Sequence, residues 1–340
     1  MTNMGFPSIE EVSKSPAFPT AIWKLEPHQS GFLPVAAGRG GPLNISWEVH
    51  GDGPMKLILI GGIGLVKADW QPQTKYFGHE RGDRYSVLVF DNRGAGASDK
   101  PVMRYSTSEM ARDLLEVLDH LGWTAERQLH ISGGSMGGMI AQEVAVIAPQ
   151  RIASLNLHCT AAKLDTSGSS LTDMTSRLGA LFPRSLETEI RSTADGCFPH
   201  AWLEAADEAS VPDSTTPKCE VPPGGYKQFA SNYARFAAQE IQLQRSKAGF
   251  ALQAVAGGFH SKTPEQLREL ADRVGRHRIM VLHGTADKMI SVELGRKLIQ
   301  YLEPGKSLVV EGLGHAPIYQ MTGFFNGLLD ERCTECENES

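Results

Sequence analysis

Short apolar runs mark the first strands that the sequence predicts. Residues 43–49, 56–60 and 86–90 are runs of strand length, and the turn signal Gly-Asp-Gly-Pro at 51–54 separates the first two. Residues 1–42 are instead rich in Pro, Gly and Ser and show little periodicity. We therefore expect an extended, partly ordered lead-in at 1–42, with the folded core beginning at residue 43.

Helical periodicity alternates with the later strands. Residues 107–121 carry apolar side chains at helical spacing, and 128–132 and 153–160 are further strand-length runs. The segment between those runs, 136–148, is helix-like and stops before Pro149. Alternating strands and helices are typical of βαβ crossovers, which build a mostly parallel sheet with helices on both faces. The sequence thus predicts an α/β fold.

The alternation breaks after residue 160 and resumes near residue 263. Segments 170–182 and 226–244 look helical, and a loop dense in Pro, Gly, Ser and Thr separates them. We interpret this region as a helical insertion. The predicted organisation is a lead-in at 1–42, a core in two parts at 43–160 and 263–332, a helical cap at 161–262, and a polar tail at 333–340.

Composition and charge exclude several classes of function. The 340 residues are 41% hydrophobic and 21% charged, which is ordinary for a globular protein with a substantial core. A net charge of −6 gives no electrostatic case for binding nucleic acid or an acidic membrane, and the apolar runs are too short to span a bilayer. The first residues lack a secretory signal pattern, so we expect a cytoplasmic protein.

The five cysteines are scattered and odd in number, which favours free thiols over a disulfide framework. Cys333 and Cys336 form a C-x-x-C, but no second pair of ligands accompanies them. We therefore expect no metal and no other cofactor, and we place this motif in the solvated tail.

The sequence G-x-S-x-G at 133–137 lies between a predicted strand and a predicted helix. A strand that turns directly into a helix holds its central residue, Ser135, in a strained conformation with the side chain above the sheet. The flanking residues have to be small because neighbouring backbone passes within contact distance. The motif alone is weak, and its strand-before, helix-after context is what favours a nucleophile.

A serine hydroxyl becomes a good nucleophile when a base accepts its proton and a third group orients the base. Asp287 follows the apolar run that ends at His283, and His315 comes directly after another apolar run. The chain order Ser, Asp, His is the order of an α/β-hydrolase triad. Asp165, after the 153–160 run, is an alternative acid. We interpret His283 as a packed residue at a strand end.

Five segments in this order resemble the α/β-hydrolase superfamily, in its capped esterase and lactonase-like branch. They are LILIGG (57–62), DNRGAGASD (91–99), GGSMGGMIAQ (133–142), HGTAD (283–287) and GLGHAP (312–317). The resemblance runs from Leu43 to Asp330. It implies an α/β-hydrolase fold with a helical cap and a serine hydrolase that needs no cofactor.

The resemblance also implies an oxyanion hole formed by the backbone N–H groups of Met136 and Ile63. Three glycines depart from the family pattern: Gly61 and Gly134 replace common histidines, and Gly64 replaces a common proline. These glycines predict a less rigid oxyanion loop and a roomier pocket floor. The candidate substrate-binding residues are Gly62, Gly64, Gly134 and His260.

Two further sets of residues have structural interpretations. We expect Asp91, Asn92 and Arg93 to fix a turn near the site through hydrogen bonds, without taking part in chemistry. His260 ends the apolar cap stretch GFALQAVAGGFH, so it either faces the pocket or is a buried structural histidine.

These residues favour a serine hydrolase that cleaves a carboxylic ester or lactone of a small, apolar substrate through an acyl-enzyme on Ser135. Acyl transfer to an alcohol and hydrolysis of an activated C–C bond remain open on the same triad. The alternative of another class is an α/β-hydrolase-like protein that binds a ligand without turnover. Beyond the small-molecule substrate we expect no nucleic-acid partner and no membrane span, and the sequence indicates no oligomeric state.

Overall fold

One mixed sheet organises the protein, whose computed structural model describes residues 5–164, 184–243 and 245–338. The eight described strands have the order β1-β2-β4-β3-β5-β6-β7-β8. β1 and β2 pair antiparallel, as do β2 and β4, and all later pairs are parallel. The strands are β1 (Gln29–Val35), β2 (Leu43–His50), β3 (Met55–Ile60), β4 (Tyr85–Phe90), β5 (Leu129–Gly134), β6 (Ile152–His158), β7 (Ile279–Gly284) and β8 (Lys306–Val310). The predicted α/β class with a mostly parallel sheet is confirmed.

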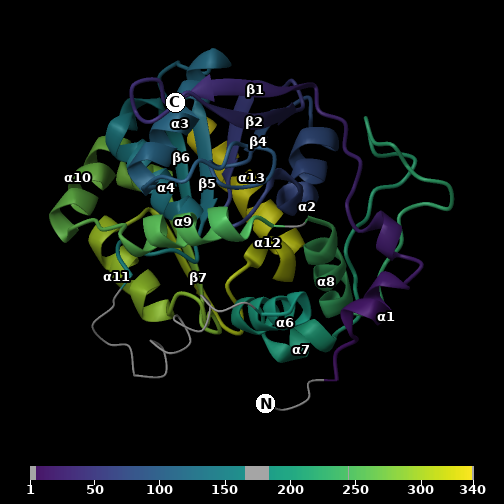
Figure 1. Ribbon diagram of the computed structural model, residues 1–340. Coiled ribbons are helices and arrows are strands. Elements are labelled where there is room, and N and C mark those ends of the chain that lie inside the picture. Colours follow the sequence, from purple (N-terminus) through teal and green to yellow (C-terminus); the bar gives the residue numbers. More distant parts are fainter. Residues whose placement is uncertain (1–4, 165–183, 244, 339–340) are drawn as a thin grey trace.

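Helices pack on both faces of this sheet (Figure 1). One apolar core joins the sheet to α3 (Thr107–His120), α4 (Met136–Ile147), α10 (Pro264–Val274) and α11 (Val292–Leu302). A second core on the other face includes residues of α13 (Thr322–Asn338) and of the segment containing α2 (Gln71–Gln73) and a π-helical turn, Thr74–His79. Short 3-10 turns lie at Phe18–Thr20, Lys67–Trp70, Pro149–Arg151 and Arg276–Arg278.

The central strands read as continuous apolar runs because both of their faces are covered. Every residue of β4, β6 and β7 is buried. Strands of parallel sheets that carry helices on both sides lose the alternation of polar and apolar residues. β8 lies at the edge of the sheet and is only partly buried.

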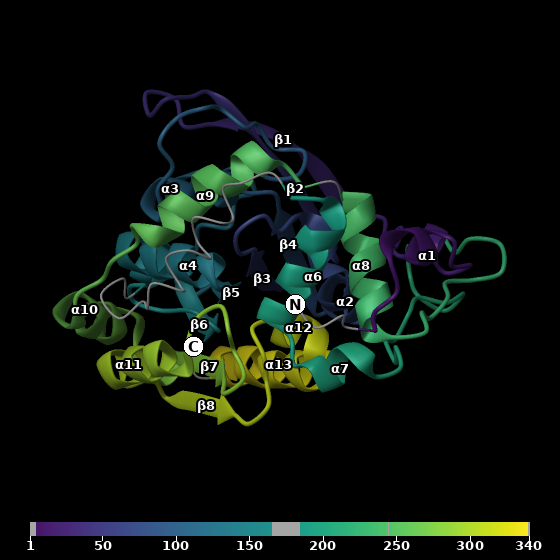
Figure 2. The ribbon, with the colours of Figure 1, turned by 60° about the horizontal axis from the view of Figure 1, so that its bottom comes forward.

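A group of helices lies in the described part of the region between β6 and α10, which the sequence predicts to be a cap and which is called the cap below. They are α6 (Leu186–Cys197), α7 (His200–Glu204), α8 (Asn232–Leu243) and α9 (Lys247–Gly258). Figure 2 shows α6 and α8 side by side, with α7 below them. The helix expected at 170–182 lies outside the described residues.

The lead-in differs from the expectation of an extended segment outside the core. It contains α1 (Ile9–Ser13), which packs against α8, and the edge strand β1. Phe6 stacks on Tyr233 of α8 with ring centroids 4.3 Å apart. The sequence signal of β1 is weak because this edge strand is mostly exposed and contains Gly31 and Pro34.

The expected polar tail at 333–340 is also wrong for residues 333–338, because α13 continues through them. Cys333 and Cys336 are buried against the sheet, one helical turn apart, and all five cysteines are free thiols. Glu337 Oε1 lies 2.8 Å from Nε2 of His130 on β5. Along the end of α13, exposed or partly exposed polar residues thus lie between and after the two buried cysteines. None of the helices within the described ranges is long and apolar enough to cross a membrane.

Candidate active site

Ser135 occupies a strained turn between β5 and α4. Its backbone angles are φ 54° and ψ −127°, a combination that residues with a side chain rarely adopt. The hydroxyl of Thr160 donates to the Ser135 carbonyl oxygen at 2.7 Å, and the Ser135 N–H donates to the His158 carbonyl at 3.2 Å. The adjacent strand β6 and the residues after it thus hold this turn in place.

The glycines around Ser135 are required by close contacts. A Cβ at Gly137 would lie 2.1 Å from the carbonyl oxygen of Ile60, and one at Gly133 would lie 2.5 Å from the carbonyl oxygen of Gly137. Contacts under 3.0 Å with backbone cannot be relieved by moving a side chain. The glycine cluster is therefore dictated by the packing of β3, β5 and α4.

Gly134 is explained by a side chain on the neighbouring strand. Gly134 pairs with His158 in the sheet, and a Cβ at position 134 would lie 2.3 Å from Cε1 of the His158 ring. That ring is buried edge-on against Trp70 and Phe325, and neither of its nitrogens has a hydrogen-bond partner among the described residues. Burial, with smaller contributions from His315 and His283, lowers the pKa of His158 to about 3. The ring is therefore neutral at pH 7.

Asp287 and His315 form the hydrogen-bonded pair that the sequence predicts. Asp287 Oδ2 lies 2.8 Å from His315 Nδ1, and Oδ1 accepts from the backbone N–H groups of Met289 and Ile290 at 2.9 Å. Burial raises the pKa of Asp287, but hydrogen bonds from His283 and His315 outweigh it and hold the pKa well below its ordinary value. An ionised Asp287 keeps the proton of His315 on Nδ1 and leaves Nε2 as the basic nitrogen.

His283 is a packed residue at the end of β7, as expected. Its side chain is fully buried, and Nε2 lies 2.9 Å from the Ile290 carbonyl oxygen and 3.3 Å from Asp287 Oδ2. It therefore supports the loop that carries Asp287. Asp165, the alternative acid, lies outside the described residues.

The three triad candidates all follow carboxyl ends of parallel strands, which meet at one edge of the sheet. Ser135 comes directly after β5, Asp287 after β7 and His315 after β8. Ser135 is partly exposed, and within the described part of the chain its hydroxyl makes no hydrogen bond to His315. Such bonds are often long in ligand-free enzymes and shorten when substrate binds.

The loop after β3 passes directly against the serine turn. A Cβ at Gly62 would lie 3.1 Å from Ser135 Cβ and 3.6 Å from its Oγ. A Cβ at Gly257 of α9 would touch both Ile63 Cδ1 and Met136 Cγ at 3.7 Å. The two residues proposed to supply oxyanion N–H groups therefore lie together beneath the cap helix α9.

Two cap residues bind the polar groups of Gly64, although the glycines predict a less rigid loop. The Gly64 N–H donates to Gln253 Oε1 at 2.7 Å, and its carbonyl accepts from Arg245 Nη1 at 2.6 Å. Gln253 Nε2 also donates to the Arg93 carbonyl at 2.9 Å. The sequence interpretation missed both residues. A signal for Gln253 was present, since it is the one polar residue within the apolar stretch GFALQAVAGG.

Residues 91–93 fix a turn beside this loop, as predicted. Asp91 accepts from the N–H groups of Lys67 and Ala97 at 2.8 Å, and Asn92 donates to the Gly61 carbonyl at 3.2 Å. These contacts join the turn after β4 to the loop after β3.

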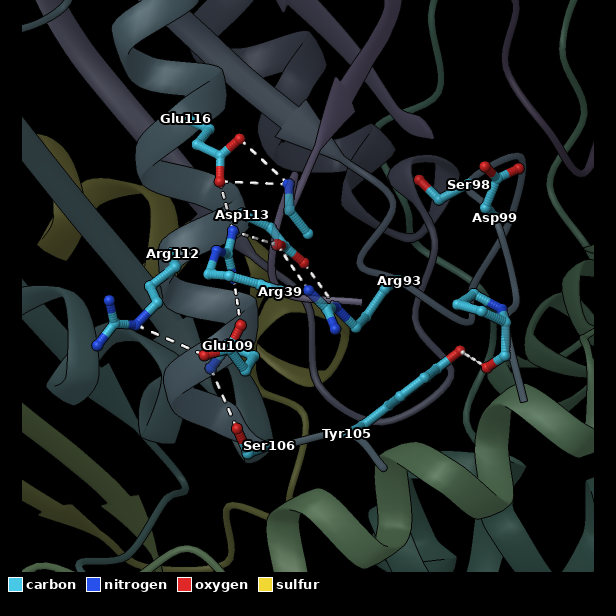
Figure 3. Close-up of polar contacts among 12 residues, drawn as sticks. Arg39, Arg93, Ser98, Asp99, Tyr105, Ser106, Glu109, Arg112, Asp113 and Glu116 are labelled. Atoms are coloured by element: carbon cyan, nitrogen blue, oxygen red, sulfur yellow. Dashed lines mark hydrogen bonds and ion pairs between the residues drawn. The ribbon is translucent and has the colours of Figure 1, made fainter. Parts of the chain in front are cut away.

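Arg93 anchors the same turn to α3 (Figure 3). Its guanidinium is fully buried and donates to the carboxylate of Asp113 through Nε at 2.6 Å and Nη2 at 2.7 Å. Arg39, from the loop between β1 and β2, binds Asp113 at 3.1 Å and also pairs with Glu109 and Glu116. The turn is thereby fixed to a rigid helix.

His260 has a buried setting at the end of the cap. Its Nδ1 lies 2.9 Å from Thr107 Oγ1 and 3.5 Å from Glu143 Oε1, and Lys262 also pairs with Glu143. Glu143 is eight residues beyond Ser135 on α4, roughly 12 Å along a helix that rises about 1.5 Å per residue. The structure therefore does not place His260 beside the serine, and its role in substrate binding stays a prediction.

A cavity of about 730 Å³ lies between the cap and the helices α2, α12 (Pro317–Gln320) and α13. Trp202, Phe236 and Tyr319 are among its walls, whereas Ser135 and His315 are not. The Tyr319 hydroxyl donates to Asp69, which also binds Arg245. Through Tyr319 and Asp69, the cavity wall thus connects to Arg245, which binds the Gly64 carbonyl. No cluster of three or more potential metal ligands occurs in the described ranges.

A family model described as the alpha/beta hydrolase fold matches residues 57–320. The chain belongs to the α/β-hydrolase family. The putative carbamate hydrolase RutD of Azorhizobium caulinodans is 29% identical over 164 residues, which cover 48% of this chain and 58% of that protein. The 3-oxoadipate enol-lactonase 2 of Acinetobacter baylyi is 36% identical over 108 residues, covering 32% and 38%. This α/β-hydrolase therefore aligns with less than two thirds of the length of these relatives.

Solved structures confirm the fold over most of the chain. A thermophilic esterase from Thermogutta terrifontis has a TM-score of 0.69 at 20% identity, covering 91% of this chain and 99% of that one. The enol-lactonase from Burkholderia xenovorans LB400 has a TM-score of 0.65 at 19% identity, covering 89% and 100%. At these identities the likeness shows that the chain has the α/β-hydrolase fold.

Proposed function

We propose that this α/β-hydrolase is a serine hydrolase that cleaves a carboxylic ester or lactone. The observation that carries the proposal is the pairing of a strained, partly exposed Ser135 with the hydrogen-bonded His315–Asp287 pair at the same edge of the sheet. The names of two relatives, a putative carbamate hydrolase and an enol-lactonase, support hydrolysis at a carbonyl carbon.

In the first half-reaction, Ser135 Oγ attacks the carbonyl carbon while its proton moves to Nε2 of His315. Asp287 stabilises the imidazolium that forms. The tetrahedral oxyanion accepts hydrogen bonds from the N–H groups of Met136 and Ile63, and each such donor is worth about 10²–10³ in rate. Collapse of this intermediate breaks the ester C–O bond, and His315 returns the proton to the departing alcohol.

In the second half-reaction, water attacks the acyl-enzyme and gives its proton to His315. The second tetrahedral intermediate releases the carboxylic acid and restores the Ser135 hydroxyl. In a lactone, the alcohol and the acid are parts of one product. Each step uses only this chain, the substrate and water.

The aromatic residues of the cap give limited support to an apolar substrate. Phe229, Tyr233 and Phe236 are buried in the apolar core that the cap forms with the N-terminal segment. They pack the cap together, although Phe236 also reaches the cavity beside α7. A panel of substrates therefore determines the chain length of the substrate that the enzyme prefers.

The test combines a fluorophosphonate probe with short-chain aryl esters, using the parent protein and Ser135→Ala. The proposal expects labelling and ester turnover by the parent, with both lost in the variant. Absence of labelling and of Ser135-dependent turnover would overturn it and favour a ligand-binding protein without activity. Added alcohols that capture the acyl group better than water would instead indicate an acyltransferase. Turnover of an activated C–C substrate, with no turnover of esters, would indicate a C–C hydrolase.

A further inference from the structure

We propose that Gln253 of the cap helix α9 is a positioning residue for the oxyanion hole, acting through Gly64. This inference rests on the proposed function and names a residue of the cap on which transition-state stabilisation depends. The Gln253 side chain is fully buried, and its two polar ends bind two different loops of the core.

The orientation of the Gln253 amide is fixed by its partners. The Gly64 N–H can only donate, so the group 2.7 Å away is the oxygen Oε1, and the Arg93 carbonyl can only accept, so the group 2.9 Å away is Nε2. Leaving a buried amide without partners is costly because its desolvation is not compensated, which explains why both ends are bound. The side chain therefore acts as a strut of defined length between the two loops.

The oxyanion loop needs such support from outside itself. Gly61 and Gly62 leave it few side chains to restrict the backbone, and Gly64 has a φ of +73°, which an ordinary residue resists. The peptide between Ile63 and Gly64 carries the N–H that Gln253 binds. Fixing this peptide plane restricts ψ of Ile63, and with it the direction of the preceding N–H proposed for the oxyanion.

The other end of the strut is rigid. The Arg93 carbonyl belongs to the turn after β4, and the Arg93 guanidinium is buried against Asp113 of α3. Figure 3 shows this contact. Asn92 in the same turn donates to the Gly61 carbonyl, at the start of the oxyanion loop. Gln253 thus closes a ring of contacts that links a helix of the core, the turn after β4 and the oxyanion loop.

Arg245 holds the other polar group of Gly64 but is a less specific probe. It also pairs with Asp69 and Glu240, so its removal would leave two carboxylates without their cationic partner in a buried region. Among the described residues, the hydrogen bonds of the Gln253 side chain go to Gly64 and Arg93. Gln253 is therefore the residue whose substitution isolates the position of the loop.

The experiment compares Gln253→Met, which keeps the length but removes both hydrogen bonds, with Gln253→Glu, which keeps the acceptor for Gly64. Val255→Ala on the exposed side of α9 is the matched control. The readouts are kcat and KM for an aryl acetate, the rate of Ser135 labelling by a fluorophosphonate, the Ki of phenylboronic acid and the melting temperature.

We expect kcat of Gln253→Met to fall about 10- to 100-fold, less than the loss of an oxyanion donor outright, with KM within about twofold. Labelling should slow and the boronic acid Ki should rise by a similar factor, since both report the tetrahedral state. Gln253→Glu should lie between Gln253→Met and the parent, and Val255→Ala should match the parent.

Three results would overturn the inference. One is a folded Gln253→Met variant with the parent's kcat. Another is a loss confined to KM, which would make Gln253 a substrate contact. The third result concerns the case in which Gln253→Met does not fold. The inference is then overturned by a folded Gln253→Glu variant whose kcat and boronic acid Ki equal those of the parent. A parent protein without Ser135-dependent turnover would instead refute the proposed function itself.

Discussion

The imidazole of His158 fills the space beside Gly134 that any side chain at position 134 would need. The two residues are sheet partners on β5 and β6, and a Cβ built on Gly134 would lie 2.3 Å from His158 Cε1. Two positions that are 24 residues apart in the sequence therefore share one volume next to Ser135, the proposed nucleophile.

This shared volume predicts a compensating pair of substitutions. Gly134→Ala should lower the free energy of unfolding by about 1–3 kcal/mol, because overpacking forces the strands apart. Gly134→Ala combined with His158→Ala should recover part of that loss, with a coupling energy of about 0.5–3 kcal/mol. Urea denaturation measures both. Gly323→Ala is the matched control, since nothing lies within 4 Å of its Cβ position. Additive losses in the double variant would contradict the shared volume.

His158 should also make stability depend on pH. Its pKa is about 3 in the folded protein and about 6.5 in the unfolded chain, so the unfolded state binds the extra proton between these values. The contribution of the neutral His158 to stability is therefore fully present above pH 6.5 and is lost as the pH drops towards 3. In His158→Leu, the slope of the unfolding free energy against pH should be smaller than in the parent by about 1.4 kcal/mol per pH unit between pH 6 and 4.5. Parallel curves for variant and parent in urea titrations would show that His158 does not titrate this way.

The Asp287–His315 contact predicts which carboxylate orients the base. Asp287→Asn should reduce kcat by roughly 10⁴-fold, because a neutral amide favours the wrong tautomer of His315. Asp165→Asn tests the alternative acid and should leave kcat unchanged. Steady-state turnover of an aryl ester by the two variants decides between them. A large loss in Asp165→Asn with activity retained in Asp287→Asn would reverse the assignment.

The ion pairs on α3 predict contrasting effects on stability. Asp113→Asn leaves the fully buried Arg93 without its carboxylate and should cost about 3–5 kcal/mol. Arg112→Ala on the same helix removes a pair with Glu109 from a side chain that is 54% exposed, and should cost about 1 kcal/mol or less. Chemical denaturation of both variants tests the difference, and equal losses would show that burial does not govern these pairs.

The positions of Ser135, Asp287 and His315 could be predicted because local signals mark them. Each follows a short apolar run, and the carboxyl ends of parallel strands meet at one edge of the sheet. His158 and Gly134 could not be paired in this way. Their contact depends on the pairing register of β5 and β6, which the local pattern of a single sequence does not determine.

Edge elements were harder to predict than central ones. β1 is mostly exposed, so it lacks the apolar run that identifies β4 or β7. The end of α13 resembles a polar tail in the sequence because only Cys333 and Cys336, small apolar residues at helical spacing, mark its buried side. Gln253 shows the converse case, in which one polar residue in an apolar helix marks a buried contact with two loops of the core.

The N-terminal segment has a consequence for protein engineering. Its first residues complete the apolar core of the cap, the Ala21 carbonyl accepts hydrogen bonds from Gln71 of the core and Gln239 of the cap, and the chain then enters the sheet as β1. The cap is consequently not an exchangeable module defined by residues 161–262. A chimaera that transplants only those residues onto a related enzyme would expose the face of Tyr233 that Phe6 covers in this protein. A functional graft therefore has to include residues 5–28 as well.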